Sequence, residues 1–275
     1  MKQVGPERPG CGGLSARPGA GCRPVVALAG NPNTGKSTLF NVLTGLNQHT
    51  GNWPGKTVLV AQGVARHRGR PYTIIDLPGT YSLLAGSLEE QVASDFLCFG
   101  RPHVTVVVVD ATCLERNLNL ALQVMEVTDK VVVCVNLIDE AERRGYAVDV
   151  RTLADELGVP AVATVAREGR GVAELLDVVE GLVDGTIVTR PRRAAYAPEV
   201  ERALRRVESR LAGRLPPGAA VRWLAARALC GDQSVLCLLA PSSGSDETVV
   251  VSLPTSVRGP FTQAENVPAE GRVSS

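Results

Sequence analysis

The chain has 275 residues, 21% of them charged, and a formal net charge of +1 at pH 7. This length is sufficient to bury the core of one large domain or two smaller ones. A net charge so close to zero argues against non-specific binding to nucleic acid or to an anionic membrane surface. No apolar run reaches the roughly 18–20 residues needed to cross a bilayer, and the N-terminus lacks the apolar segment of a secretory signal.

The seven cysteines form no C-x-x-C pair. Cys98 and Cys134 lie in apolar runs, so we expect both to be buried free thiols in a reducing compartment. The spacing needed for a structural zinc site is absent. These features predict a cytosolic protein.

The first predicted elements surround a glycine-rich loop. Residues 25–29 form a short apolar run typical of a buried strand, and residues 37–43 have the pattern of a helix. Between them the chain matches G-x-x-x-x-G-K-[ST], the loop that wraps a nucleotide's phosphates. Backbone N–H groups at the start of such a helix point at the phosphates. The predicted nucleotide-binding residues of this loop are Gly30, Asn31, Pro32, Asn33, Thr34, Gly35, Lys36, Ser37 and Thr38.

Individual residues of the loop have distinct expected roles. Gly30 and Gly35 permit backbone angles and a close approach that a Cβ would block. Lys36 can place its ammonium on the β- and γ-phosphates, and the Ser37 hydroxyl can ligate Mg²⁺. The alternative is a glycine turn that binds no ligand.

The elements that follow alternate between strands and helices. Such alternation predicts an α/β fold with a mostly parallel sheet and helices on both faces, as in a P-loop GTPase of the Ras-like type. Ligands bind beyond the carboxyl ends of such strands. The sequence predicts a polar loop at 47–57, strands at 58–67, 72–77, 103–111, 130–138 and 160–165, and helices at 89–99, 114–127 and 172–183, with short helices before residue 158.

Composition changes near residue 186. The proline-interrupted, basic stretch 186–198 is predicted to be a linker, and residues 199–213 and 219–231 have helical periodicity. We therefore expect a GTPase domain at 24–186 and a small, incomplete helical domain at 187–240. The Gly-, Pro- and Arg-rich residues 1–23 are predicted to be a disordered leader, and residues 241–275 a mostly disordered tail.

Two further motifs favour GTP over ATP. Asp76 and Gly79 belong to a D-x-x-G motif at a predicted strand end, where Asp76 can hold Mg²⁺ through a water and the Gly79 N–H can meet the γ-phosphate. Asn136 and Asp139 form an N-x-x-D motif at the end of another strand. The Asp139 carboxylate can accept both N–H groups of the guanine N1/N2 edge, and adenine offers no such pair. Each motif alone is more often a turn, but their order and placement predict guanine.

At this point the sequence resembles a known family. Residues 51–57 are GNWPGKT, residues 76–83 DLPGTYSL, residues 110–118 DATCLERNL, and residues 139–145 DEAERRG. Together they are similar to the bacterial ferrous iron transport protein B (FeoB) family. The resemblance covers residues 24–232, which correspond to that family's GTPase domain and its small helical domain; in the latter, residues 222–225 (RWLA) resemble the family.

The resemblance implies further ligands. It implies that Thr57 ligates Mg²⁺ in the GTP state, and that Asn33 helps to bind K⁺ together with the carbonyls of Gly51 and Trp53. Such a K⁺ offsets developing charge, as an arginine finger does elsewhere. Thr80 occupies the place where a water-orienting glutamine is often found, so we expect slow intrinsic hydrolysis in which Lys36, Thr57 and Gly79 are the catalytic residues. Asn33 as a turn-stabilising amide, and Trp53 as a packing residue, are the alternatives.

The sequence departs from the family at several positions. Val165 replaces a usual serine in the base-contacting loop, although the backbone N–H near Ala166 can still meet the guanine O6, with faster nucleotide exchange a possible consequence. Lys56 replaces an apolar residue and Cys113 an asparagine. Past residue 230 the likeness to the helical domain ends, and the membrane domain with which the family continues has no counterpart in this sequence.

The resulting hypothesis is a cytoplasmic GTP hydrolase of a ferrous iron uptake system, dependent on Mg²⁺ and stimulated by K⁺. Its expected partners are GTP or GDP and a membrane-embedded iron permease domain or subunit at the inner face of the cell membrane, with no nucleic acid. One alternative is a non-catalytic GDP/GTP-binding module, or a truncated remnant, that regulates a membrane partner. Another is a ribosome- or tRNA-associated GTPase, which the lack of a basic appendage disfavours.

Overall fold

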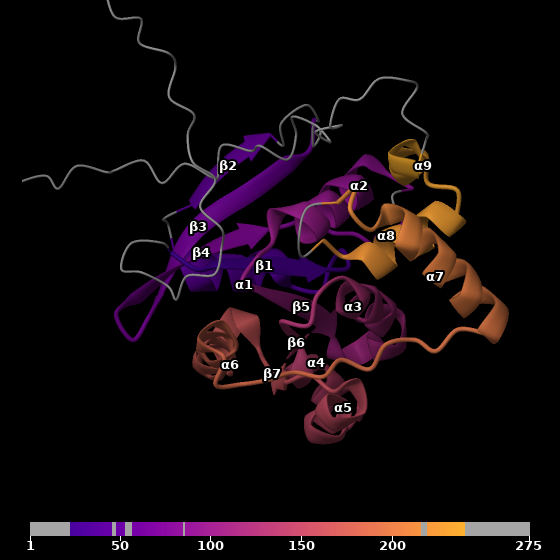
Figure 1. Ribbon diagram of the computed structural model, residues 1–275. Coiled ribbons are helices and arrows are strands. Elements are labelled where there is room, and N and C mark those ends of the chain that lie inside the picture. The colour runs from indigo at the N-terminus through magenta and orange to yellow at the C-terminus, as the bar shows by residue number, and fades with distance from the viewer. Residues whose placement is uncertain (1–22, 46–47, 53–56, 85, 216–218, 240–275) are drawn as a thin grey trace, which may run out of the picture.

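The computed structural model describes residues 23–45, 48–52, 57–84, 86–215 and 219–239 (Figure 1). Trp53, Lys56, residues 1–22 of the predicted leader and the predicted tail at 241–275 lie outside these ranges. Among the helices of the described residues, none combines the length and the apolar character needed to span a membrane.

A single seven-stranded sheet forms the centre of the molecule, in the order β2-β3-β4-β1-β5-β6-β7. β4, β1, β5, β6 and β7 run parallel, while β2 and β3 are antiparallel to their neighbours. The predicted mostly parallel sheet is confirmed, but the loop predicted at 47–57 was wrong in part, because it contains strand β2. The strands are β1 (Val25–Gly30), β2 (Gln48–Asn52), β3 (Leu59–His67), β4 (Arg70–Asp76), β5 (Val104–Asp110), β6 (Val131–Asn136) and β7 (Ala161–Ala163).

The helices lie on both faces of this sheet. The predicted helix 89–99 is an α-helix, α2, continued by a π-helical turn at Phe96–Gly100. The α-helices are α1 (Lys36–Thr44), α2 (Leu88–Asp95), α3 (Leu114–Val127), α4 (Ile138–Arg143), α5 (Val150–Leu157), α6 (Val172–Asp184), α7 (Pro198–Leu211), α8 (Val221–Leu229) and α9 (Gln233–Leu239).

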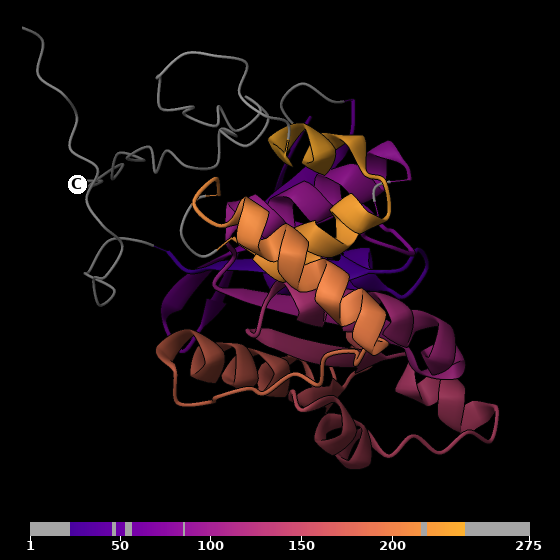
Figure 2. The same cartoon turned by 45° about the vertical axis from the view of Figure 1, so that its right-hand side comes forward.

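Two apolar clusters sandwich the sheet. The central strands β5 and β6 are buried on both faces, which explains their unbroken runs of β-branched residues. On one face, α1 and α6 pack against a cluster that includes Phe40, Tyr72 and Leu175. On the other face, α2 and α3 share a cluster with α7, α8 and α9, which we call the helical appendage. Leu204 of α7 and Trp223 of α8 are buried in this cluster. Figure 2 shows α7, α8 and α9 beside α2 on this second face.

Buried charges join the helical appendage to the second face. Arg227 of α8 is 2% exposed; its guanidinium donates to Asp232 at 2.8 Å and to Ser94 of α2 at 3.2 Å. Arg222 of the same helix pairs with Glu126 of α3 at 3.4 Å and with Glu201 of α7 at 2.7 Å. Each arginine therefore links α8 to a helix that packs on the sheet, α2 or α3.

The predicted linker is held against the end of α5 by backbone hydrogen bonds. Arg190 N donates to Gly158 O at 3.0 Å, and Arg192 N donates to Leu157 O at 2.9 Å. Gly158 has a φ of +70°, and a Cβ there would lie 2.1 Å from the Arg190 carbonyl oxygen. Only glycine permits both the backbone angle and this close approach. We call residues 186–197 the strap.

Ion pairs fasten the β3–β4 hairpin to α6. His67 Nε2 lies 2.7 Å from Asp177 Oδ1, and His67, Asp177 and Glu180 place ligand-type atoms within 4.8 Å of one another. Arg68, however, pairs with both carboxylates, at 2.7 and 3.3 Å. The group is thus an ion-pair network between the hairpin and the helix.

Candidate nucleotide-binding site

The carboxyl ends of β1, β4 and β6 meet at one edge of the sheet, since these strands belong to its parallel part. Gly30 ends β1, Asp76 ends β4 and Asn136 ends β6, so the three motifs predicted from the sequence come together there. A cavity of about 570 Å³ opens at this edge. It is lined by Asn31, Pro32, Asn33, Gly35, Lys36, Ser37, Thr38 and Gly79.

The glycine-rich loop is held in a tight turn at the start of α1. Asn33 and Gly35 both have left-handed backbones, with φ of 67° and 80°. A Cβ on Gly35 would lie 2.3 Å from Asn136 Nδ2, so the loop fits against β6 only because this residue is glycine. The Thr34 hydroxyl donates to Asn31 O at 3.0 Å and closes the turn from within. The first turn of α1, Lys36 to Thr38, lines the cavity, which is the placement that anion binding at a helix N-terminus requires.

Lys36, Ser37 and Asp76 converge below this loop. The Lys36 ammonium, in a side chain that is 8% exposed, forms an ion pair with Asp76 and donates to Leu77 O at 2.6 Å. The Ser37 hydroxyl donates to the other Asp76 oxygen at 3.2 Å. An ammonium, a hydroxyl and a carboxylate thus lie together beside the cavity, and two of the three residues, Lys36 and Ser37, line it.

The D-x-x-G loop closes over the glycine-rich loop. Gly79 lies against Pro32, and Thr80 N donates to Gly30 O at 3.2 Å. Thr80 itself is 3% exposed, and its hydroxyl is bonded within the turn to Ser82. Thr80 is therefore a turn-forming residue whose hydroxyl is already used.

Asn136 ties the glycine-rich loop to the residues that follow β7. Its Nδ2 donates to Thr34 O at 2.9 Å, and its Oδ1 accepts from Ala166 N at 2.9 Å and from the Thr164 hydroxyl at 3.1 Å. The side chain is 1% exposed. Because the Ala166 N–H already donates to Asn136, any contact it makes with a guanine O6 is shared with that bond. Val165, the residue before it, is fully buried and bonds Arg170 through its backbone.

The Asp139 carboxylate lies at the start of α4, with its two oxygens in different environments. Oδ2 accepts from Arg143 at 2.8 Å and from Arg167. Oδ1 is buried and has no hydrogen-bond partner within the part of the chain that the structure describes. A buried acceptor without a partner is costly, so this oxygen suits a ligand that brings an N–H donor.

The other predicted ligands are less enclosed. Thr57 and Asn33 are exposed, and Gly51 lies on the edge strand β2. Trp53, predicted to supply a carbonyl, lies outside the described residues.

Two residues escaped the sequence analysis. Thr164 is 1% exposed and bonds both Asn136 and the Cys134 thiol, at 3.1 Å each. Leu137 has a left-handed backbone with φ of 61° and separates Asn136 from α4. No local pattern marks Thr164, because its partners are distant in sequence, and leucine is an uncommon choice for a left-handed position.

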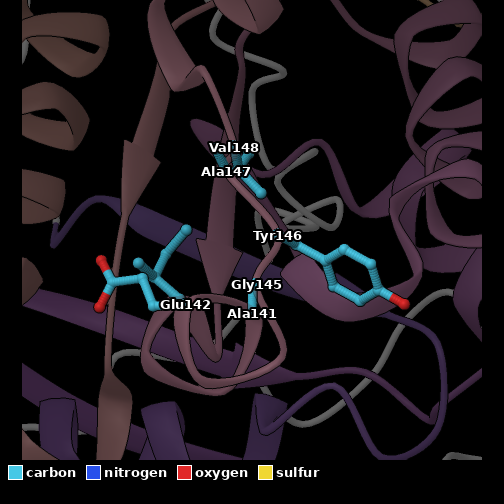
Figure 3. Close-up of a pocket in the computed structure, with 7 residues that line it drawn as sticks. Ala141, Glu142, Gly145, Tyr146, Ala147 and Val148 are labelled. Atoms are coloured by element: carbon cyan, nitrogen blue, oxygen red, sulfur yellow. The ribbon is translucent and has the colours of Figure 1, made fainter.

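A second hollow lies beside α4, with a volume of about 470 Å³. Figure 3 shows Glu142 and Tyr146 pointing to opposite sides of the turn that borders it. It is lined by Ile138, Ala141, Glu142, Gly145, Tyr146, Ala147 and Val148, of which only Ile138 falls within a predicted nucleotide motif, N-x-x-D. It shares no lining residue with the cavity at the glycine-rich loop.

Comparison with known families identifies the chain. Residues 24–179 match a family model described as ferrous iron transport protein B. The chain belongs to this family. It is 40% identical over 216 residues to an Fe(2+) transport protein A/Fe(2+) transporter FeoB fusion protein of Porphyromonas gingivalis, and 44% identical over 155 residues to the Fe(2+) transporter FeoB of Salmonella typhimurium. These alignments cover 76% and 55% of this chain but only 25% and 20% of the relatives.

Solved FeoB structures share the fold. The cytosolic domain of Thermotoga maritima FeoB in its apo form aligns with a TM-score of 0.72 and 35% identity, over 86% of this chain and 94% of that one. A GDP-bound variant of Streptococcus thermophilus NFeoB aligns with a TM-score of 0.71 and 36% identity, over 80% and 84%. The chain therefore carries the GTPase fold of the FeoB N-terminal G domain.

Proposed function

We propose that this chain binds and hydrolyses GTP in a Mg²⁺-dependent reaction, as the cytosolic GTPase part of a ferrous iron uptake system. The observation that carries the proposal is the convergence of Lys36, Ser37 and Asp76 beneath the glycine-rich loop, and the buried Asp139 Oδ1, which has no partner among the described residues, supports a base with N–H donors. The GDP-bound FeoB relative supports the choice of nucleotide.

The donor set below the loop fits Mg²⁺. Hydroxyl and carboxylate oxygens are the ligands that this ion takes in phosphate sites, and the Ser37 hydroxyl and Asp76 carboxylate lie 3.2 Å apart. Ser37, Thr57 and Asp76 would hold the ion, which when bound neutralises phosphate charge. Lys36 has to turn from Asp76 toward the phosphates, and Gly79 offers its N–H to the γ-phosphate.

The site also favours a monovalent cation near the phosphates. The Thr80 hydroxyl is bonded within its own turn, and its side chain is too short to orient an attacking water. Charge stabilisation has to come from elsewhere. Asn33, exposed in a left-handed turn at the cavity, would hold K⁺ with the backbone carbonyls of Gly51 and Trp53.

The uptake role depends on a partner. The curated relatives are Fe(2+) transporters about four to five times longer than the matched region. We propose that the GTPase acts at the inner face of the cell membrane, through a membrane-embedded iron permease domain or subunit.

Steady-state GTP turnover tests the catalytic proposal. We expect Lys36→Ala and Ser37→Ala to abolish Mg²⁺-dependent turnover, whereas Ser37→Thr, which keeps the hydroxyl, should retain it. In the wild type, turnover should be faster in KCl than in NaCl at matched ionic strength, and Asn33→Ala should remove the difference. Saturable GDP binding without any turnover would instead establish the alternative, a non-catalytic GDP/GTP-binding module.

A further inference from the structure

The two oxygens of the Asp139 carboxylate accept different numbers of hydrogen bonds. The Asp139 side chain is 14% exposed, and both arginines that contact it bond the same oxygen, Oδ2. A carboxylate oxygen offers two lone-pair sites, so the two guanidinium groups occupy Oδ2 fully. Oδ1 is buried and accepts no hydrogen bond from the described residues.

A guanine base presents two parallel donors, N1–H and N2–H, which match the two oxygens of one carboxylate. The free Oδ1 can accept one of them at once. The second donor needs a place on Oδ2, and one arginine must leave to provide it. When the protein binds both donors of the guanine edge, the second donor therefore competes with an arginine of the protein for Oδ2.

Arg143 is the arginine better able to leave. It lies one helical turn after Asp139, is 60% exposed, and already has a second carboxylate, Glu140, at 3.4 Å. Exposed pairs of this spacing contribute little to stability, so transfer from Asp139 to Glu140 costs little. Arg167 is 51% exposed and also has a second carboxylate, Glu168, at 3.6 Å, but it follows directly after Ala166, whose backbone N–H is bonded to Asn136, so its main chain is held more firmly.

We propose that Arg143 competes with guanine for Asp139 Oδ2 and moves to Glu140 when the base binds. Arg143 is thus a specificity-determining residue that weakens recognition of the guanine 2-amino group and hastens release. This inference rests on the proposed nucleotide site, in which Asp139 recognises the base.

Comparison of GDP with inosine diphosphate isolates the second donor, because hypoxanthine keeps N1–H and lacks the 2-amino group. Affinities of both ligands are measured by calorimetry for the wild type, Arg143→Ala and Arg170→Ala. Arg170 is a suitable control because it is 53% exposed and pairs with Glu142 at 3.9 Å, not with Asp139 or Glu140. We expect the preference for GDP over inosine diphosphate to rise about tenfold in Arg143→Ala, the effect of one hydrogen bond to a charged acceptor, and to change less than twofold in Arg170→Ala.

The outcomes separate the two proposals. If the wild type binds GDP but the preference in Arg143→Ala is unchanged or falls, the competition is disproved, while the nucleotide site stands. If the wild type binds neither ligand, the proposed function fails, and this inference fails with it. An equal rise in Arg170→Ala would assign the effect to general charge and would also overturn the proposal.

Discussion

The two faces of the sheet are built differently. The face under α1 and α6 is packed with apolar side chains, and the ion pairs described for it lie at its margins, one between Lys36 and Asp76 at the cavity and the others between the hairpin and α6. The face under α2 and α3 carries a larger apolar cluster together with the buried charges of Arg227 and Glu126, and Glu126 pairs with the partly buried Arg222. Apolar contact is non-directional, whereas a buried ion pair is satisfied in one geometry. The difference suggests that the charged face fixes where the helical appendage sits.

Loss of Arg227 should give the largest decrease in the free energy of unfolding. Arg227→Leu removes the guanidinium that Asp232 and Ser94 bond, and breaking such a buried pair costs about 3–5 kcal/mol. Urea unfolding measures the change in the free energy of unfolding. Arg205→Leu is the control, since Arg205 is 64% exposed and lies 4.0 Å from Glu201; a similar loss in both variants would contradict the assigned role.

On the apolar face, a cavity left by a shortened side chain should lower the free energy of unfolding somewhat less than the loss of Arg227 does. Leu175 of α6 is 1% exposed, and Leu175→Ala should lower the free energy of unfolding by about 3 kcal/mol through lost burial and the remaining void. The matched variant is Leu122→Ala, because Leu122 is 41% exposed on α3. Equal losses from the two leucines would show that α6 does not depend on the buried cluster.

The ion pairs at the rim of the apolar face should contribute little to the free energy of unfolding. Asp177→Asn removes the carboxylate shared by His67 and Arg68, but the Asp177 side chain is 43% exposed. We expect a loss below about 1 kcal/mol, and a smaller one in high salt because exposed charges are screened. A loss as large as that of Leu175→Ala would show that the hairpin is held by charge.

The smallest expected signal is the maleimide labelling of two buried thiols, one on each face of the sheet. Burial raises the pKa of Cys98, on the charged face, and of Cys134, on the apolar face, to about 12. Both thiols are therefore protonated at pH 8 and should resist maleimide, becoming thiolates only as the pH rises toward the raised pKa. Mass spectrometry should find the exposed Cys230 labelled and both buried thiols unlabelled.

The same labelling sharpens the comparison between faces. In Arg227→Leu we expect Cys98 to become reactive while Cys134 stays protected. Simultaneous labelling of both thiols in this variant would mean that the two faces open as one unit.

Sequence patterns predicted the centre of the molecule best. The strand and helix around the glycine-rich loop differ from the observed β1 and α1 by at most one residue at each end, because a short apolar run, two glycines and a helical repeat are all local signals. The predicted burial of Cys98 and Cys134 is confirmed for the same reason. Strand β2 was missed, since its residues, Gln48 to Asn52, are polar and form a strand only through pairing with β3.

Long-range side-chain contacts escaped the sequence analysis. The N-x-x-D motif predicted that Asn136 and Asp139 belong to the nucleotide site, but nothing local predicted that Thr164 bonds Asn136 or that the distant Arg167 shares one oxygen of Asp139 with Arg143. Such contacts depend on where β6 and β7 end relative to one another. The assignments of Asp139 to the base and of Asn33 to K⁺ stay predictions.

The strap shows how mutation can act unevenly along a sequence. Its bonds to Gly158 and Leu157 use backbone atoms of Arg190 and Arg192, so the side chains there are open to exchange during divergence. Proline is barred at these two positions, which must donate, and is harmless at Pro191 between them. Gly158 has no such freedom, because any Cβ meets the Arg190 carbonyl. Among relatives whose strap follows the same path, glycine should therefore be nearly invariant at position 158, whereas the side chains of the strap that crosses it should vary.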